Sequence, residues 1–218
     1  MSVTLRAKVA VLGDRAVGKT ALAQMYQSKG KLFPKNYKLT GGMDVVVVPT
    51  HIEGTKATVE LYICDVSGHQ MFSDMQPQLL DNVNLVILVY DQSSRQSFEA
   101  CAACLKLLSS VPSNRGKTIQ GVLVGNKHDL VGQVSYDADG DGEVTAEEVA
   151  AANEKLGKLR QRAVSLEEAK EWAESRQLTF MESSALPPGK DIDAPFKWCA
   201  KNFHERYEER LAQLAKAA

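Results

Sequence analysis

The chain has 218 residues, enough for one domain that buries a sheet between helices but short for two. Its 26 basic and 27 acidic residues leave a formal charge of -1, which argues against a general binder of nucleic acid or anionic membranes. No apolar stretch is long enough to cross a bilayer, and the first residues are too polar for a secretory signal. We therefore expect a soluble cytoplasmic protein, in which the four cysteines form no disulfide framework.

An apolar run over residues 5–12 ends at a glycine loop with the spacing G-x-x-x-x-G-K-T. In this spacing the backbone N–H groups curve around a phosphate, the lysine neutralises it, and the final hydroxyl can bind Mg²⁺. A strand before the loop and a helix over residues 21–28 supply the context that the motif requires. The predicted phosphate-binding residues are Gly13, Ala16, Val17, Gly18, Lys19, Thr20 and Ala21.

The rest of the chain alternates between expected strands and helices. Residues 44–49 predict an edge strand, because Pro49 cannot donate to a ladder, with residues 57–64 as its hairpin partner. The continuous apolar run over residues 85–90 is typical of a central parallel strand. Further expected elements are a helix over 97–109, a strand over 119–125, a helix from the capping box Ser165-x-x-Glu168, a strand over 178–182 and a helix over 196–214. This order predicts a three-layer α/β fold with a mostly parallel, six-stranded sheet and an antiparallel edge strand.

Two later motifs narrow the nucleotide to one with guanine. Asn126, Lys127 and Asp129 form N-K-x-D at the carboxyl end of a strand, where ligands of open α/β sheets bind. The Asp129 carboxylate can accept hydrogen bonds from the N1–H and 2-amino groups of guanine, a pattern that adenine lacks. Asn126 would tie this loop to the phosphate loop, and the stem of Lys127 would cover the base. Ser184 and Ala185 match a loop that offers backbone N–H groups to the guanine carbonyl.

Together these motifs resemble those of the Ras superfamily of small GTPases, from residue 5 to about residue 207 apart from one insertion. The resemblance implies a P-loop GTPase fold that binds GTP or GDP with Mg²⁺. By the same resemblance, Thr40 and Asp65 join Thr20 around Mg²⁺, and the Gly68 N–H binds the γ-phosphate. Phe33 would lie against the base, and Tyr37 would lie over the phosphates.

The spacing of Phe33, Tyr37, Thr40 and Asp44 is similar to that of the Rab branch. Residues 33–47 and 187–196 further resemble the Rab-like GTPases of the intraflagellar transport B complex. That resemblance implies a place in the cilium or flagellum and a heterodimer with a small β-sandwich subunit of the complex. Rab proteins end in prenylated cysteines, whereas the last cysteine here, Cys199, falls inside an expected helix. We therefore expect no direct lipid anchor.

Two positions depart from the pattern of efficient GTPases. Those enzymes carry a glutamine directly after D-x-x-G, where it orients the attacking water, but this chain has His69. A neutral imidazole can hydrogen-bond water, yet its reach is shorter and stiffer. Arg15 replaces a small residue of the phosphate loop and either acts as a built-in arginine finger or points to solvent. We take both as candidate catalytic residues and predict slow hydrolysis with retained GTP binding.

The insertion over residues 130–164 contains the pattern D-x-D-x-D-G-x₅-E without a mismatch. This spacing places carboxylate and carbonyl oxygens around Ca²⁺ in an EF-hand, with a bidentate glutamate at the end. The ligands would be Asp137, Asp139, Asp141, Glu143 and Glu148. The alternative is a solvated acidic loop, because the helix before it would be short and the chain has no second EF-hand.

We therefore predict one small-GTPase domain over residues 1–218, with an EF-hand-like insertion, that acts as a slow GTP-binding switch subunit. Two other functions remain open at this point. The protein could be a structural adaptor whose nucleotide only completes the fold, or a calcium-responsive regulatory module.

Overall fold

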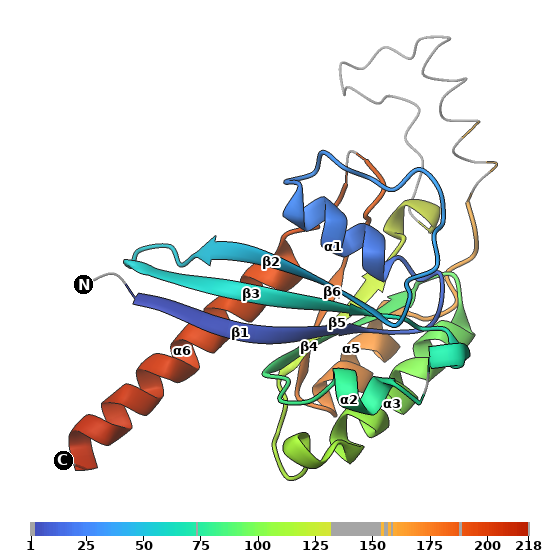
Figure 1. The fold of residues 1–218 in the computed structure, drawn as a ribbon. Helices are drawn as coiled ribbons and strands as arrows, with labels where there is room; N and C mark the ends of the chain where they lie inside the picture. The colour runs from blue at the N-terminus through green and yellow to red at the C-terminus, as the bar shows by residue number, and fades with distance from the viewer. Residues whose placement is uncertain are drawn as a thin grey trace, which may run out of the picture.

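A six-stranded sheet forms the centre of the molecule in the order β2-β3-β1-β4-β5-β6 (Figure 1). The computed structural model describes residues 3–217 apart from 73, 132–153, 155, 156, 158 and 188. The strands are β1 (Val3–Leu12), β2 (Met43–His51), β3 (Ala57–Val66), β4 (Leu85–Asp91), β5 (Gly121–Asn126) and β6 (Leu178–Glu182). Only β2 is antiparallel to its neighbour, and the other pairs are parallel. The predicted α/β sheet with an antiparallel edge strand is thus confirmed, whereas the predicted calcium loop lies outside the described residues.

Helices cover both faces of the sheet, as Figure 1 shows. They are α1 (Lys19–Gln27), α2 (Gln76–Leu79), α3 (Arg95–Ser110), α5 (Leu166–Glu174) and α6 (Ala194–Ala217). One apolar core lies between the sheet and α1 with α6, and the other between the sheet and α3 with α5, joined by Leu80 directly after α2. Side chains alternate between the two cores along β1, because successive residues of a strand point to opposite faces. Val9 and Val11 enter the first core, and Ala10 and Leu12 enter the second.

The far end of α1 is fastened to two other elements. The ring of Tyr26 stacks on the ring of Phe196 in α6, with centroids 4.3 Å apart. The Tyr26 hydroxyl also lies 2.6 Å from the Thr50 hydroxyl in β2. Because α1 begins at the phosphate loop, these contacts hold that loop in place from the other end of the helix.

The helix predicted from the capping box begins where expected, but only half of the box forms. The Ser165 hydroxyl accepts a hydrogen bond from the Glu168 N–H at 3.1 Å and caps α5. The Glu168 carboxylate instead pairs with the Arg95 guanidinium at 2.5 Å, and a charged partner outcompetes a backbone N–H. Among the described residues, no helix is both long enough and apolar enough to span a bilayer.

Candidate functional site

The phosphate loop follows β1 at the edge of the sheet where the parallel strands end. Gly13 has φ +149°, and a Cβ at this position would lie 2.1 Å from the Val89 carbonyl oxygen. Gly18 has φ +98°, and a Cβ there would lie 2.3 Å from Nδ2 of Asn126. Both positions therefore require glycine, because the backbone conformation and the close neighbours exclude a side chain.

The predicted phosphate-binding lysine is enclosed by this loop. The Lys19 ammonium donates to the carbonyl oxygens of Gly13 at 3.0 Å and Asp14 at 2.8 Å. The residue is only 6% exposed, and burial lowers the pKa of Lys19, although the Asp65 charge opposes that effect. The loop thus holds a buried positive charge at its centre, where an anion would be stabilised.

The three residues predicted around Mg²⁺ converge from α1, β3 and the connection before β2. The Thr20 hydroxyl donates to Oδ2 of Asp65 at 2.6 Å and lies 3.2 Å from the Thr40 hydroxyl. The other oxygen of Asp65 is buried and has no hydrogen-bond partner within the described part of the chain. Burial raises the pKa of Asp65, with Thr20 and Lys19 acting in the opposite direction. A buried carboxylate with a spare oxygen beside two hydroxyls fits Mg²⁺, which prefers oxygen ligands.

A cavity of about 720 Å³ opens beside these residues. Its lining comes from the phosphate loop, the connection after α1 and the loop after β3, and includes Arg15, Ala16, Ala21, Phe33, Tyr37, Gly68 and His69. Phe33 is half-buried against the first core, whereas Tyr37 is 70% exposed. The Arg15 side chain is exposed as well.

The loop after β3 lies directly on the phosphate loop. A Cβ on Gly68 would lie 2.5 Å from the Gly13 carbonyl oxygen and 2.7 Å from the Arg15 nitrogen. The next residue, His69, is half-buried, and its Nδ1 accepts a hydrogen bond from the Met71 N–H at 3.2 Å. Because Nδ1 is engaged, Nε2 is the ring nitrogen of His69 that remains to hydrogen-bond a water or ligand.

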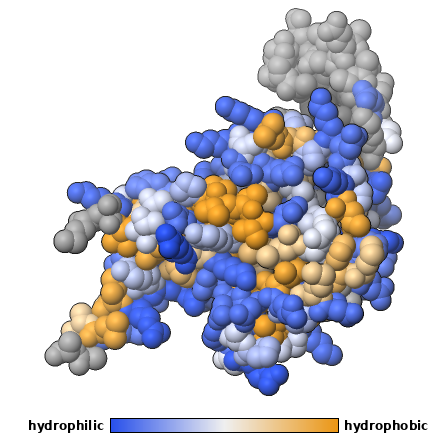
Figure 2. Space-filling view, viewed as in Figure 1, coloured by the Kyte–Doolittle hydropathy of each residue, from blue (hydrophilic) through white to orange (hydrophobic). Residues whose placement is uncertain are grey.

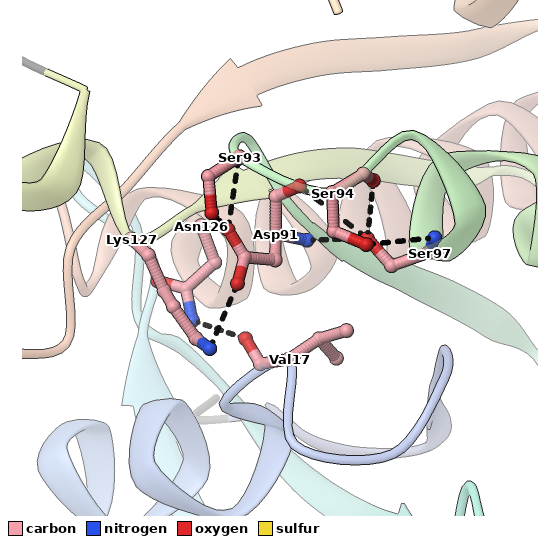
Figure 3. A network of polar contacts seen from close by, with 7 residues as sticks. All are labelled: Val17, Asp91, Ser93, Ser94, Ser97, Asn126 and Lys127. Atoms are coloured by element: carbon pink, nitrogen blue, oxygen red, sulfur yellow. Dashed lines mark hydrogen bonds and ion pairs between the residues drawn. The ribbon is translucent and has the colours of Figure 1, made fainter. Parts of the chain in front are cut away.

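The N-K-x-D loop is tied to the phosphate loop, as Figure 3 shows. Nδ2 of Asn126 donates to the Val17 carbonyl oxygen at 2.8 Å, so Asn126 ties the two loops together as predicted, and the structure supplies the partner. The Lys127 ammonium pairs with Oδ2 of Asp91 at 2.9 Å. Asn126 is buried at 1% exposure, so the link between the two loops is shielded from water.

Sequence reasoning missed Asp91, which ends β4 and holds Lys127. The Ser93 N–H and hydroxyl donate to its Oδ1 at 2.9 and 2.7 Å (Figure 3). Burial acts to raise the pKa of Asp91, but the hydrogen bonds from Lys127 and Ser93 outweigh this effect and lower the pKa. The available signal was a carboxylate directly after the buried run over residues 85–90, at the edge where ligands bind.

The remaining predicted residues lie at the ends of β5 and β6. The Ser184 hydroxyl donates to the Asp129 carboxylate, which brings the two expected base-binding loops together. Ala185 is buried beside them at 5% exposure. The structure therefore gathers the predicted residues into two neighbouring groups, one around the cavity and one at these strand ends, joined through Asn126. The five predicted calcium ligands lie outside the described residues.

Comparison with known proteins agrees with this arrangement. Residues 8–205 match the family model described as the Ras family. The chain is 38% identical to intraflagellar transport protein 27 of Chlamydomonas reinhardtii over 217 residues, which cover 100% of this chain and 93% of that protein. It is 38% identical to the homologue of Homo sapiens over 210 residues, 96% of each chain. The Ras-related protein Rab-30 of Homo sapiens is 29% identical over 178 residues, 82% of this chain and 70% of that protein. The chain therefore belongs to the Ras family and, within it, to the group formed by intraflagellar transport protein 27 and its homologues.

Proposed function

We propose that the protein is a Rab-like guanine-nucleotide switch of the intraflagellar transport machinery, located in the cytoplasm and in the cilium or flagellum. The observation that carries this proposal is the 2.8 Å hydrogen bond from Asn126 to Val17, which joins the phosphate loop to the N-K-x-D loop. Membership of the Ras family implies GTP or GDP with Mg²⁺, and similarity to intraflagellar transport protein 27 supports the transport role.

Each group of residues has a separate task in this proposal. The N–H groups of residues 13–21 surround the phosphates, and Lys19 neutralises them. Thr20, Thr40 and Asp65 would hold Mg²⁺, which would supply positive charge that offsets the charge of the phosphates. The Gly68 N–H binds the γ-phosphate, so the loop after β3 responds to its presence. The remaining contacts to the nucleotide come from Phe33, Tyr37, Lys127, Asp129, Ser184 and Ala185.

Hydrolysis is slow in this proposal because His69, and not a glutamine, directly follows Gly68. His69 has one ring nitrogen engaged by Met71 at 3.2 Å, so only Nε2 remains to orient a water. Arg15 is exposed, which supports the interpretation that it points to solvent rather than acting as an arginine finger. The protein then stays in its GTP-bound state until a partner or nucleotide exchange changes it.

Guanine specificity gives the sharpest test of nucleotide binding. A fluorescent GDP analogue should bind the purified protein and be displaced by GDP or GTP but not by ATP. Asp129→Asn should weaken the binding of GDP and strengthen the binding of xanthosine diphosphate, because an amide can donate to the 2-oxo group of xanthine. Asp81→Asn is the matched control, since Asp81 is exposed and precedes β4 at the opposite edge of the sheet. Equal displacement by ATP and GTP would contradict the assignment.

The pattern D-x-D-x-D-G-x₅-E supports an additional Ca²⁺ site in the insertion. The Arg160 N–H donates to the Leu130 carbonyl at 2.7 Å, so the two sides of the insertion leave the fold at one point. Calorimetry should detect Ca²⁺ with an affinity of about 10⁻⁶ to 10⁻³ M. Glu148→Gln should abolish the heat, whereas Glu147→Gln, one residue away and outside the ligand pattern, should retain it. No heat with millimolar Ca²⁺ would leave the segment a solvated acidic loop.

The protein also acts, in this proposal, as one subunit of a heterodimer with a small β-sandwich subunit of the intraflagellar transport B complex. Edge strand β2 supports a protein partner, because Val45 and Val47 are 48% and 45% exposed. Figure 2 shows apolar surface gathered over the part of the molecule where β2 runs in Figure 1. Val47→Glu should prevent co-elution with the recombinant partner, whereas Lys106→Glu on α3 should not. Unchanged assembly by Val47→Glu would exclude β2 from the interface.

A further inference from the structure

His128, the unassigned third residue of N-K-x-D, belongs to one of the two loops expected to hold the base and contacts the other. Its backbone N–H donates to the Ser183 carbonyl at 3.1 Å, and its ring Nε2 lies 2.9 Å from the Lys190 ammonium. The backbone of Lys190 in turn pairs with that of Ser184 through two hydrogen bonds of 3.0 Å. The ring and Lys190 thus form a third connection between the loops, beside the backbone hydrogen bond to Ser183 and the contact of Ser184 with Asp129.

The contact with Lys190 sets the protonation state of the ring. An ammonium group can only donate hydrogen bonds, so Nε2 of His128 accepts and carries no proton. The proton of the neutral ring is then on Nδ1, which lies 3.4 Å from Oε1 of Gln92 and 3.6 Å from Oε2 of Glu182. The geometry therefore requires a neutral imidazole when the two loops are together.

The charges around the ring also favour its neutral form. Lys190 and Arg162 contribute positive charge, and Glu182 and Asp129 contribute negative charge. Burial is the largest effect and Lys190 the next, and together they lower the pKa of His128 despite Glu182. Glu182 opposes both effects, but its Oε1 accepts a hydrogen bond from Arg162 at 2.7 Å, and the positive charge of Arg162 itself lowers the pKa of His128.

We propose that His128 is a positioning residue for the guanine base, whose neutral ring holds the Ser184 loop against Asp129 through Lys190 and whose protonation separates them. A protonated ring presents an N–H group to the ammonium, so attraction is replaced by repulsion between two positive groups. The bound guanine nucleotide then leaves faster at acidic pH. This inference rests on the proposed function, because guanine binding assigns the two loops to the base.

The direction and size of the effect follow from linkage. The loops held together favour the neutral ring, and the separated loops let the pKa of His128 return toward its ordinary value, so acid favours separation. Lys190 is exposed, and water screens its interaction with the ring. We therefore expect dissociation of GDP to become about three- to tenfold faster between about pH 7.5 and about pH 5.5.

The test is the dissociation rate of a preloaded fluorescent GDP analogue, chased with excess GDP at constant excess Mg²⁺ across this pH range. His128→Gln keeps a hydrogen-bond acceptor for Lys190 but cannot be protonated. Its GDP dissociation rate should therefore increase less than the wild-type rate when the pH is lowered. Lys190→Met should release the GDP analogue faster than wild type at neutral pH, and its rate should also increase less than the wild-type rate at acidic pH. His51→Gln, which changes an exposed histidine of β2, is the matched control and should keep the wild-type profile.

The possible outcomes separate this inference from the proposed function. Identical pH profiles for wild type, His128→Gln and Lys190→Met would overturn the role of His128 while leaving nucleotide binding intact. Absence of any binding by the wild type would instead refute the proposed function. If His128→Gln fails to fold, Lys190→Met decides, because its exposed side chain can be replaced while the backbone bridge to Ser184 remains.

Discussion

Replacing Asn126 by alanine should loosen the phosphate loop and weaken nucleotide binding. The substitution removes the donor that reaches the Val17 carbonyl at 2.8 Å, in a place where Asn126 is only 1% exposed. Losing one partner of a buried hydrogen bond costs about 1–3 kcal/mol. Oδ1 of Asn126 is itself buried without a partner among the described residues, so its removal recovers part of this cost. We therefore expect a loss of about 1–2 kcal/mol, or about five- to thirtyfold in the Kd for GDP.

Asn114 supplies a control of the same residue type and burial. It is also 1% exposed, and its Nδ2 donates to the carbonyls of Leu80 at 2.7 Å and Leu108 at 3.2 Å, away from the phosphate loop. Asn114→Ala should therefore lower the unfolding free energy but leave the Kd for GDP unchanged. Titration of a fluorescent GDP analogue measures the Kd, and urea unfolding measures stability. The reasoning is refuted if the Kd of Asn126→Ala for GDP lies within twofold of the wild-type Kd, or if Asn114→Ala weakens GDP binding as much as Asn126→Ala does.

Three further substitutions test the site and the fold. His69→Gln should accelerate single-turnover GTP hydrolysis, and an unchanged rate would show that this position is not limiting. Burial raises the pKa of Asp65 in the folded protein above its pKa in the unfolded chain. The protonated carboxyl therefore stabilises the fold fully at a pH below the unfolded pKa, and this stabilisation is lost as pH rises through the folded pKa. Nucleotide-free Asp65→Asn should consequently have a higher Tm than wild type near pH 7, with the gain shrinking toward pH 4; a constant gain would contradict this. Phe196→Ala removes a fully buried ring from the stack with Tyr26 and should cost about 3–5 kcal/mol in urea unfolding; a loss below about 1 kcal/mol would contradict the packing argument.

Residues that follow a strand directly were predictable, because parallel strands end at one edge and bring their loops together. Asp129 and Ser184 follow two expected strands, and the structure places them in hydrogen-bond contact. Asn126 reaches Val17 for the same reason, although 109 positions separate them in the chain. These contacts depend on the order of the strands rather than on side-chain detail, and the order follows from the alternation of helices and strands.

Contacts between side chains on different loops were not predictable in this way. His128 and Lys190 are 62 positions apart, and neither periodicity nor a motif relates them. The contact of the Glu168 carboxylate with Arg95, in place of the backbone N–H of Ser165, was not predictable for the same reason. It depends on how α3 and α5 pack against each other. Local patterns describe what a residue can do, whereas the fold decides which of several partners is near enough.

The order of the strands also fixes the distance between the loop that binds the phosphates and the loops that bind the base. The phosphate loop leaves β1 and the two base loops leave β5 and β6, which are two and three strand positions away. With neighbouring strands about 4.8 Å apart, those positions correspond to about 10 and 14 Å across the sheet. This span is set by backbone hydrogen bonds between strands, so it does not depend on the length of any surface segment. Because Arg160 and Leu130 join the two sides of the insertion at 2.7 Å, a new module can be added there without changing the distance from phosphate to base.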